Sequence, residues 1–237
     1  MPGDVDDSTA LRTYIEIGTR PSSEVRIVLW GPNNWDAWRL HAPPEDDWES
    51  FPEQALRSAA ERIPGRRGLT VADLGCGEGR LVPFLADRYA RVIAVDYAPA
   101  SLAEARKRQP RENVQYRRRD MRDLTPFREA FDVAVAVQSI VGPRRADVDR
   151  ILRQVWRSLR EGGLLLALFP AADRVGEPVP LVLGETHDGP EPLRFLETEL
   201  QYRLRRAGFL GLRIRRFEGD DTRPGALLAR ASRRANN

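Results

Sequence analysis

The sequence is poor in several residue types on which large classes of protein chemistry depend. Its 237 residues include one cysteine, two histidines and a single lysine, Lys107. The lone cysteine, Cys76, excludes an intramolecular disulfide. Lys107 lies away from every glycine-rich segment, which argues against the phosphate-binding loop of nucleoside triphosphate hydrolases. The histidines and the cysteine are not clustered, so no metal site is predicted.

Long apolar segments are also missing. The longest strongly apolar run, 164–169, is far too short to span a bilayer. The N-terminus reads M-P-G-D-V-D-D-S-T, which is acidic and lacks the apolar core of a secretion signal. We therefore expect a cytoplasmic protein without a membrane partner. A chain of 237 residues, 41% of them hydrophobic, is long enough to bury one good-sized core.

The chain does contain a glycine-rich turn between a strand and a helix. Residues 71–79 read V-A-D-L-G-C-G-E-G, and glycines there can take positive φ and bring backbone amides close to a ligand. The amides that open the following helix favour electron-rich groups at the same place. A dinucleotide-binding G-x-G-x-x-G motif would need its third glycine at the position of Arg80. The nicotinamide interpretation is therefore weakened.

The order and spacing of five motifs resemble the class I S-adenosylmethionine-dependent methyltransferases over roughly residues 69–217. The motifs are V-A-D-L-G-C-G-E-G at 71–79, V-I-A-V-D at 92–96, R-R-D-M at 118–121, F-D-V-A-V-A-V-Q at 131–138 and L-R-E-G-G at 159–163. The resemblance implies a Rossmann-like α/β fold with S-adenosylmethionine as cofactor and S-adenosylhomocysteine as product.

The resemblance also implies which residues bind the cofactor. Asp96 ends an apolar segment, and its two carboxylate oxygens match the two hydroxyls of the ribose. Asp120 and the backbone amide of Met121 are expected to contact adenine, and Asp73 the loop and the amino end of the methionine. Cys76 is expected to be a small buried filler and not a nucleophile. The expected set is Asp73, Gly75, Cys76, Gly77, Asp96, Tyr97, Asp120, Met121 and Gln138.

Alternating strand and helix patterns predict a doubly wound, seven-stranded, mostly parallel sheet with an antiparallel C-terminal edge hairpin and an N-terminal helical and aromatic extension. A capping-box pattern, S-F-P-E, marks the start of the first helix at residue 51. The expected strands are 69–74, 91–96, 114–118, 131–137, 164–169, 210–217 and 226–231. The expected helices are 51–63, 80–87, 99–109, 146–159 and 193–207.

Two segments outside these motifs are candidates for acceptor binding. Residues 1–65 are predicted to be an extension and lid of the same domain, and the core is expected at 66–237 with a lid loop at about 170–193. Four of the five tryptophans lie in the first 50 residues. Because ligands bind at the carboxyl edge of an open α/β sheet, we expect both segments to enclose a partly apolar acceptor there. Alternatively, the tryptophans simply pack the extension onto the sheet.

Methyl transfer from a sulfonium is an in-line displacement, so positioning and exclusion of water supply most of the acceleration. A hydroxyl acceptor benefits from a base, for which His187 in the lid loop is the candidate and His41 the weaker choice. Tyr14 could orient an acceptor. The segment V-Q-S-I-V-G lacks the Asp/Asn-Pro-Pro-Tyr/Phe signature of methyltransferases that act on DNA bases or glutamine. The prediction is therefore methylation of an oxygen or nitrogen of a small molecule, by a monomer or homodimer.

Two alternatives remain open. A tRNA or protein methyltransferase would use the arginine clusters at 117–119, 144–145 and 213–216 as its docking face. A nucleic-acid substrate prefers a continuous basic face with stacking aromatics, and these clusters sit at different strand and helix ends, so nucleic acid is not the favoured partner. The second alternative is a non-catalytic module that binds S-adenosylmethionine and contacts a partner chain through its tryptophan-bearing N-terminus.

Overall fold

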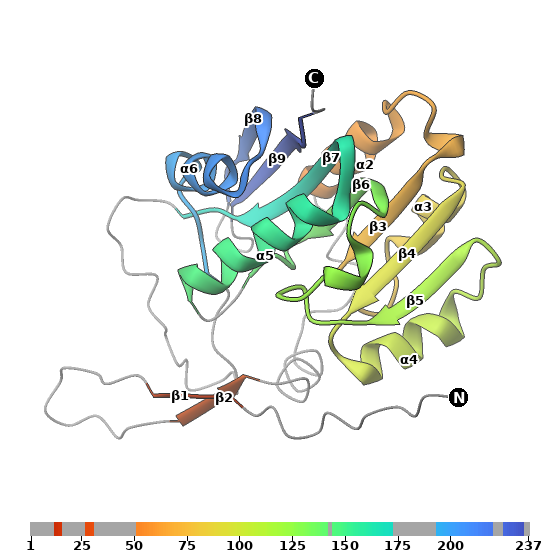
Figure 1. Ribbon diagram of the computed structural model, residues 1–237, viewed down its shortest axis with the longest axis horizontal. Coiled ribbons are helices and arrows are strands. Elements are labelled where there is room, and N and C mark those ends of the chain that lie inside the picture. Colours follow the sequence, from red (N-terminus) through yellow and green to blue (C-terminus); the bar gives the residue numbers. More distant parts are fainter. Residues whose placement is uncertain are drawn as a thin grey trace, which may run out of the picture.

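A seven-stranded sheet in the order β5-β4-β3-β6-β7-β9-β8 organises the chain (Figure 1). The computed structural model describes residues 12–15, 27–30, 51–141, 144–172, 193–219 and 225–234. Strands β3 to β7 are parallel, and β9 and β8 complete the sheet as an antiparallel hairpin. The strands are β3 Thr70–Leu74, β4 Arg91–Asp96, β5 Val114–Arg118, β6 Phe131–Val137, β7 Leu159–Pro170, β8 Leu210–Phe217 and β9 Ala226–Ser232. The predicted fold class is confirmed.

A second, two-stranded sheet lies in the N-terminal segment. It pairs β1 (Arg12–Ile15) with β2 (Ile27–Trp30) in antiparallel orientation. The sequence patterns did not predict these strands. The rest of the first 50 residues, and with it the predicted aromatic lid, lies outside the described residues.

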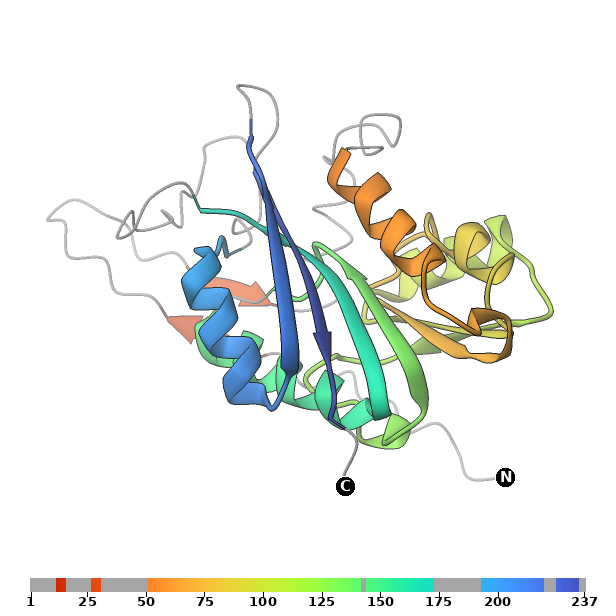
Figure 2. The same cartoon turned by 90° about the horizontal axis from the view of Figure 1, so that it is seen from above.

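Helices cover both faces of the large sheet (Figure 2). Apart from the edge strand β5, the parallel strands are largely apolar on both sides, as strands buried between two helical layers must be. Leu56 and Leu85 pack on one face, whereas Leu152 and Leu204 pack on the other. The first face carries α2 (Phe51–Glu61), α3 (Val82–Ala86) and α4 (Pro99–Arg108), and the second carries α5 (Arg145–Ser158) and α6 (Glu197–Ala207). Two short 3-10 helices are η2 (Arg66–Gly68) and η3 (Thr125–Phe127). No helix in the described parts of the chain has both the length and the apolar composition to cross a membrane.

Several element boundaries differ from the predicted ones, and three of the differences have a structural reason. Helix α6 begins at Glu197 and not at 193, because Phe195 makes a parallel bridge with Ala171 and so holds the preceding residues extended. Strand β7 begins five residues before the predicted position, because Leu159 pairs with Phe131 ahead of an irregularity in the ladder. Helix α3 is shorter than predicted, because the turn that precedes it continues past Gly79, whose φ is +83°.

The turn after β3 requires glycine for two separate reasons. Gly75 has a φ of +72°, and a Cβ at this position would lie 2.3 Å from the Cβ of Ser139. The N–H groups of Gly75 and Cys76 both donate to the carbonyl oxygen of Val95, at 2.7 and 3.0 Å. Gly77 has a φ of +53°, but a Cβ there would meet no atom within 4 Å. The first glycine is thus required by conformation and by space, and the second by conformation alone.

Alanine substitutions should separate these two requirements. Gly75→Ala combines backbone strain with a steric clash and is expected to lower the free energy of unfolding by about 2–5 kcal/mol. Gly77→Ala carries the strain alone and should cost about 1–2 kcal/mol. Urea denaturation followed by circular dichroism measures both values. Equal losses in the two variants would contradict the proposed contact with Ser139.

Candidate functional site at the carboxyl edge of the sheet

Four neighbouring strands bring the predicted cofactor residues to one edge of the sheet. Parallel strands present their carboxyl ends on the same side, so the residues that follow β3, β4, β5 and β6 meet there. Asp73 and the glycine turn come from β3, Asp96 and Tyr97 from β4, and Asp120 from the segment after β5. Gln138 directly follows β6. The edge therefore assembles the whole predicted set from segments far apart in the sequence.

Asp96 is held in place by two backbone amides. Its Oδ2 accepts from the N–H of Gly77 and its Oδ1 from the N–H of Ala98, each at 2.8 Å. A carboxylate offers about four acceptor positions on its two oxygens. A half-buried carboxylate fixed in this way is suited to two adjacent hydroxyls, as in the ribose of a nucleoside.

Asp73 is a buried carboxylate with an unsatisfied oxygen. Its residue is 3% exposed, and Oδ2 has no hydrogen-bond partner among the described residues. Burial, as the largest cause, together with the charges of Asp96 and Glu53 raises the pKa of Asp73 from 3.8 to about 7, although the charge of Arg80 opposes this increase. A buried acceptor without a donor is costly and rare in native proteins. The arrangement fits a ligand that brings a cationic donor, such as an ammonium group.

Glu53 and Arg80 join helix α2 to the glycine turn, and sequence reasoning did not assign either to the site. The Glu53 side chain is 3% exposed and accepts from Arg57 at 2.9 Å and from Arg80. The capping-box pattern placed Glu53 at a helix start, but its partner Ser50 lies outside the described residues. The structure shows that its carboxylate contacts two arginines. The one signal in the sequence was helical spacing. Glu53 lies three residues before the core residue Leu56, so the two side chains share one face of the helix.

Ser139 fixes the end of β6 to the end of β3. Its hydroxyl donates to the carbonyl oxygen of Leu74 at 2.5 Å, and its Cβ fills the space that a side chain at position 75 would need. The preceding residue, Gln138, has a φ of +50° and donates its N–H to Leu168. Only the folded sheet brings 139 next to 75, so no local pattern indicated this contact.

The residues expected to bind adenine are also held in place, by hydrogen bonds or by packing. The Asp120 carboxylate accepts from the Arg122 guanidinium at 2.6 Å and from the Arg122 backbone N–H at 2.8 Å. The side chain of Met121 packs partly against the core beneath α5. Asp120 is therefore oriented by Arg122, which was not among the predicted site residues.

Cys76 contributes its backbone to the turn and its side chain to the core. The residue is 7% exposed and packs with Val82, Ala94 and Leu102. Burial, followed by the charges of Asp73 and Asp96, raises the pKa of the thiol well above its ordinary value. A thiol that stays protonated is a poor nucleophile, so the expectation of a small buried filler is confirmed.

The predicted catalytic residues cannot be placed in this site. His187, His41 and the lid residues 173–192 lie outside the described residues. The backbone of Tyr14 lies in β1, paired with Val28, but its side chain is outside the described part. The roles of His187 as a base and of Tyr14 in orienting an acceptor stay predictions.

Comparison with known proteins agrees with the geometry of the edge. A family model described as a methyltransferase domain matches residues 71–163. A trans-aconitate 2-methyltransferase from Deinococcus radiodurans is 30% identical over 61% of this chain and 50% of its own length. A ubiquinone biosynthesis O-methyltransferase from a Methylobacterium species is 34% identical over 47% of this chain and 48% of its own length. The chain thus spans about half the length of the curated relatives it matches.

The fold also recurs among solved structures. An S-adenosylmethionine-dependent methyltransferase from Mesorhizobium loti aligns with a TM-score of 0.62 and 23% identity, covering 78% of this chain and 99% of its own. That likeness shows the shared fold, and the family match covers the glycine turn, Asp96 and Asp120. Residues 71–163 thus match a methyltransferase-domain family model, and the described residues share the fold of a solved S-adenosylmethionine-dependent methyltransferase.

Proposed function

We propose that this chain transfers the methyl group of S-adenosylmethionine to an oxygen or nitrogen atom of a small molecule. The observation that carries the proposal is the Asp96 carboxylate, which Gly77 and Ala98 fix at the end of β4. Strand β4 pairs with β3, which carries the unsatisfied Asp73. One acid suits the ribose of the donor and the other its ammonium group. The family match to residues 71–163 supports the same donor.

The residues of the edge would act by positioning. The bound donor supplies an electrophilic methyl group on its sulfonium. Asp96 would orient the ribose, Asp120 and the Met121 amide would receive the adenine, and Asp73 would hold the amino end. The glycine turn, tied to Val95, would allow the backbone to approach the donor closely. Such positioning in a site closed to water is the main requirement of a displacement reaction.

The nature of the acceptor is inferred from the relatives and from the predicted lid. Two relatives are named for small-molecule chemistry, trans-aconitate methylation and ubiquinone biosynthesis. The segments at 1–50 and about 170–193 are proposed to close over the acceptor at the carboxyl edge. Incubation of the protein with isotopically labelled donor and a cell extract, followed by mass spectrometry, identifies the product that gains one methyl group. The position of the label in that product then shows whether the methylated atom is oxygen or nitrogen.

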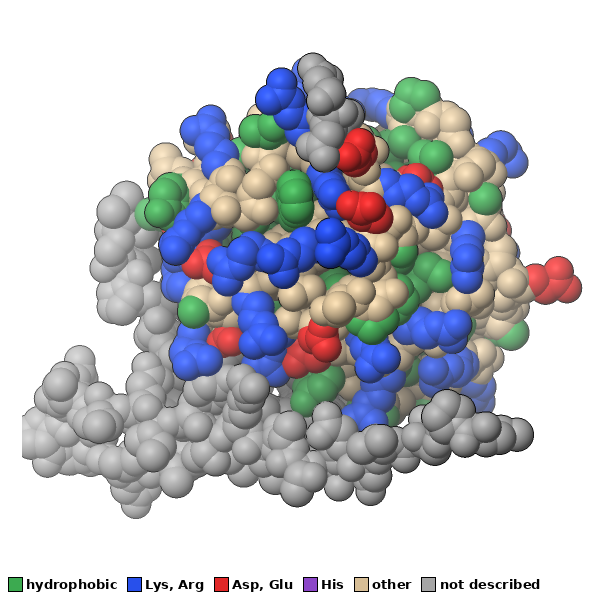
Figure 3. Space-filling view, viewed as in Figure 1, with side chains coloured by type: hydrophobic (Ala, Val, Ile, Leu, Met, Phe, Trp, Pro, Cys, Tyr) green, Lys and Arg blue, Asp and Glu red, His purple; other side chains and the backbone are tan. Residues whose placement is uncertain are grey.

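One observation favours a second candidate, a tRNA acceptor. Figure 3 shows basic side chains gathered in a band over the region where α5 lies in Figure 1. The exposed arginines of this helix recur three and four residues apart at Arg150, Arg153 and Arg157. Salt-dependent binding of bulk tRNA, lost when these three arginines are changed to glutamine, would support this candidate over a small molecule.

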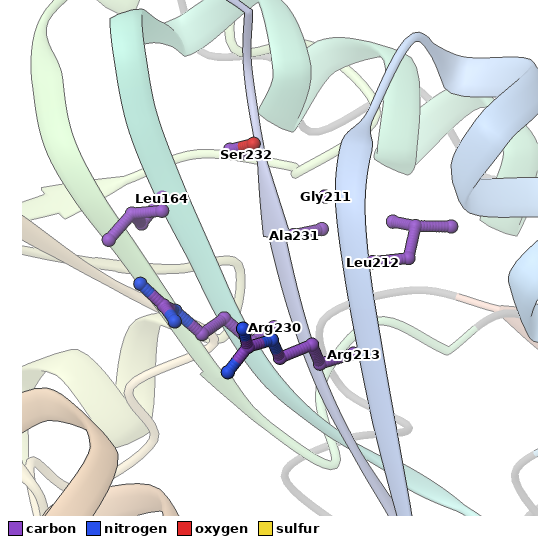
Figure 4. A pocket seen from close by; sticks show the side chains of 7 residues that line it. All are labelled: Leu164, Gly211, Leu212, Arg213, Arg230, Ala231 and Ser232. Carbon is purple, nitrogen blue, oxygen red and sulfur yellow. The ribbon is translucent and has the colours of Figure 1, made fainter.

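The arginine clusters noted in the sequence do not form a single face. Residues 117–118 lie on the edge strand β5, whereas Arg145 begins α5. Arg213, on the opposite edge of the sheet, faces Arg230 across the β8–β9 ladder. These two line a surface hollow of about 300 Å³ and extend across the sheet in the same direction (Figure 4). This dispersal supports a small-molecule acceptor.

Donor binding provides the direct test of the Asp96 role. The wild-type protein is expected to bind S-adenosylhomocysteine in titration calorimetry. Asp96→Asn should weaken binding about 100-fold, because hydrogen bonds to a charged acceptor contribute roughly 1.5–3 kcal/mol. Asp123→Asn, a change at an exposed acid outside the predicted donor set, serves as the control and should bind normally. A folded wild-type protein that does not bind S-adenosylhomocysteine would refute the proposal.

The pH dependence of donor binding should reflect the protonation of the Asp73 carboxyl. With a pKa of about 7, this carboxyl holds a proton below neutrality, and an incoming ammonium must displace it. Donor affinity is therefore expected to rise by up to about tenfold per unit between pH 5.5 and 7, and to level off above pH 8. Calorimetry at several pH values measures this slope, which Asp73→Asn should abolish.

The raised pKa of Asp73 also predicts how the stability of the ligand-free protein depends on pH. An unfolded aspartate loses its proton near pH 3.8, whereas buried Asp73 keeps it to about 7. The stabilising contribution of this group is thus complete below pH 3.8 and declines as the pH rises to 7. At pH 8, Asp73→Asn should unfold at higher urea concentration than the wild type, with a gain of at most about 4 kcal/mol. A variant less stable than the wild type at pH 8 would contradict this account.

A further inference from the structure

The hairpin of β8 and β9 is irregular near the start of β8. Its ladder shifts between residues 210 and 213, where three steps along β8 correspond to two steps along β9. Gly211 lies in this shift with a φ of +59°, as in the β-bulge that begins with a left-handed glycine. In a regular ladder, the residue before Arg213 would stand opposite Arg230. The bulge instead pairs Arg213 with Arg230.

The bulge thereby places two like charges directly opposite each other. Arg213 and Arg230 are both exposed, and their side chains extend across the sheet in the same direction (Figure 4). Opposite residues of an antiparallel pair are close neighbours, and like charges at such positions destabilise a sheet. Within the described part of the chain, neither guanidinium has a hydrogen-bond or ion-pair partner. The pair therefore lacks a counter-charge among the described residues.

The two arginines line a surface hollow of about 300 Å³. Ile214, the next residue of β8, packs toward the core on the α5 and α6 side, so the arginines face the other side of the sheet. Among the described residues that line the hollow, none is acidic and none is aromatic. Besides the two arginines, the lining residues are Leu164, Gly211, Leu212, Ala231 and Ser232.

The hollow is separate from the candidate donor site. Strand β8 runs parallel to β7, because both are antiparallel to β9. Arg213 lies in the first half of β8 and therefore away from the carboxyl edge, at which this strand ends with Phe217. All of the lining residues also lie outside the region 71–163 that matches the methyltransferase domain. A ligand bound here would not contact the residues expected to hold the donor.

We propose that this hollow is an accessory binding site for a phosphate group, carried by inorganic phosphate or by a small phosphomonoester. A guanidinium presents its N–H donors in a planar fork that matches two phosphate oxygens. Two guanidinium groups balance the charge of about −1.5 to −2 that a phosphomonoester carries at pH 7. The volume lies at the small end of ligand sites, which range from roughly 300 to 1,000 Å³. A nucleic acid would instead require a longer basic face with aromatic side chains for stacking.

Protection of the sheet border is the competing explanation. Arg213 lies on the border strand β8, where a charged side chain discourages pairing with another chain. Arg230 lies on β9, which pairs with β7 on one side and with β8 on the other. Border protection therefore does not account for Arg230. It also predicts that phosphate and chloride affect the protein equally at the same ionic strength.

Thermal unfolding in the two salts separates these explanations. At constant pH and ionic strength, inorganic phosphate at about 10 mM is expected to raise the unfolding midpoint of the wild type by about 2–5 °C relative to chloride, with saturation at higher concentration. Arg213→Gln and Arg230→Gln should each lose at least about half of this gain, and the double variant all of it. Arg91→Gln is the matched control, because Arg91 is an exposed strand arginine that stands opposite Thr70, and it should keep the gain.

The same variants should behave in the opposite sense when phosphate is absent. Loss of one of two facing like charges relieves their repulsion, so Arg213→Gln and Arg230→Gln should unfold in dilute chloride at a temperature about 1–2 °C above the wild type. Arg91→Gln should show no such increase. A lower midpoint for both hairpin variants would show that the arginines stabilise the hairpin by packing, and would overturn the argument from an unbalanced pair.

Two further outcomes would overturn the phosphate site. One is a wild-type midpoint that is the same in phosphate and in chloride, and the other is a phosphate gain that survives in the double variant. Stabilisation by bulk tRNA and not by phosphate would also overturn it, and would assign the arginines to a nucleic acid. Glycerol 3-phosphate distinguishes the two carriers, because half of the gain at a lower concentration than with inorganic phosphate supports a phosphomonoester as the ligand.

Discussion

The carboxylate of Asp96 joins two neighbouring strand ends, because one oxygen accepts from Gly77 after β3 and the other from Ala98 before α4. The carbonyl of Val95 adds two further bonds to the same turn. The position of the turn is thus set by β4 as much as by its own strand. Every other part of the candidate donor site, from Asp73 to Arg80, depends on this attachment for its place relative to the ribose-binding acid.

Helix α2 extends the site beyond the part of the chain that matches the methyltransferase family. It packs on the sheet face through Leu56 and Ala60 and reaches the turn through Glu53. Apolar burial fixes the helix, and the ion pair uses that fixed position to hold a charge beside the turn.

Much of the fold could be predicted because its signals are local. Strands β3 and β4 are mostly apolar and buried, and the glycine turn and Asp96 stand directly at their ends. Strand β5 is more polar, but its place after β4 still indicated Asp120. The start of α6 was misplaced, because the bridge between Phe195 and Ala171 competes with helix formation and joins residues far apart in sequence. Ser139, Arg122 and Glu53 were missed for the same reason, since each acts through a partner that only the assembled sheet brings near.

The two outer strands of the sheet share one property. Both β5 and β8 carry arginines, at residues 117–118 and at Arg213 and Arg215, and within the described part of the chain each has one edge that pairs with no further strand. Unpaired strand edges invite other chains to extend the sheet, and rows of like charge oppose such pairing. Two copies brought edge to edge would place these guanidinium groups against one another. Arginine at both borders therefore protects this sheet against growth into a continuous intermolecular one.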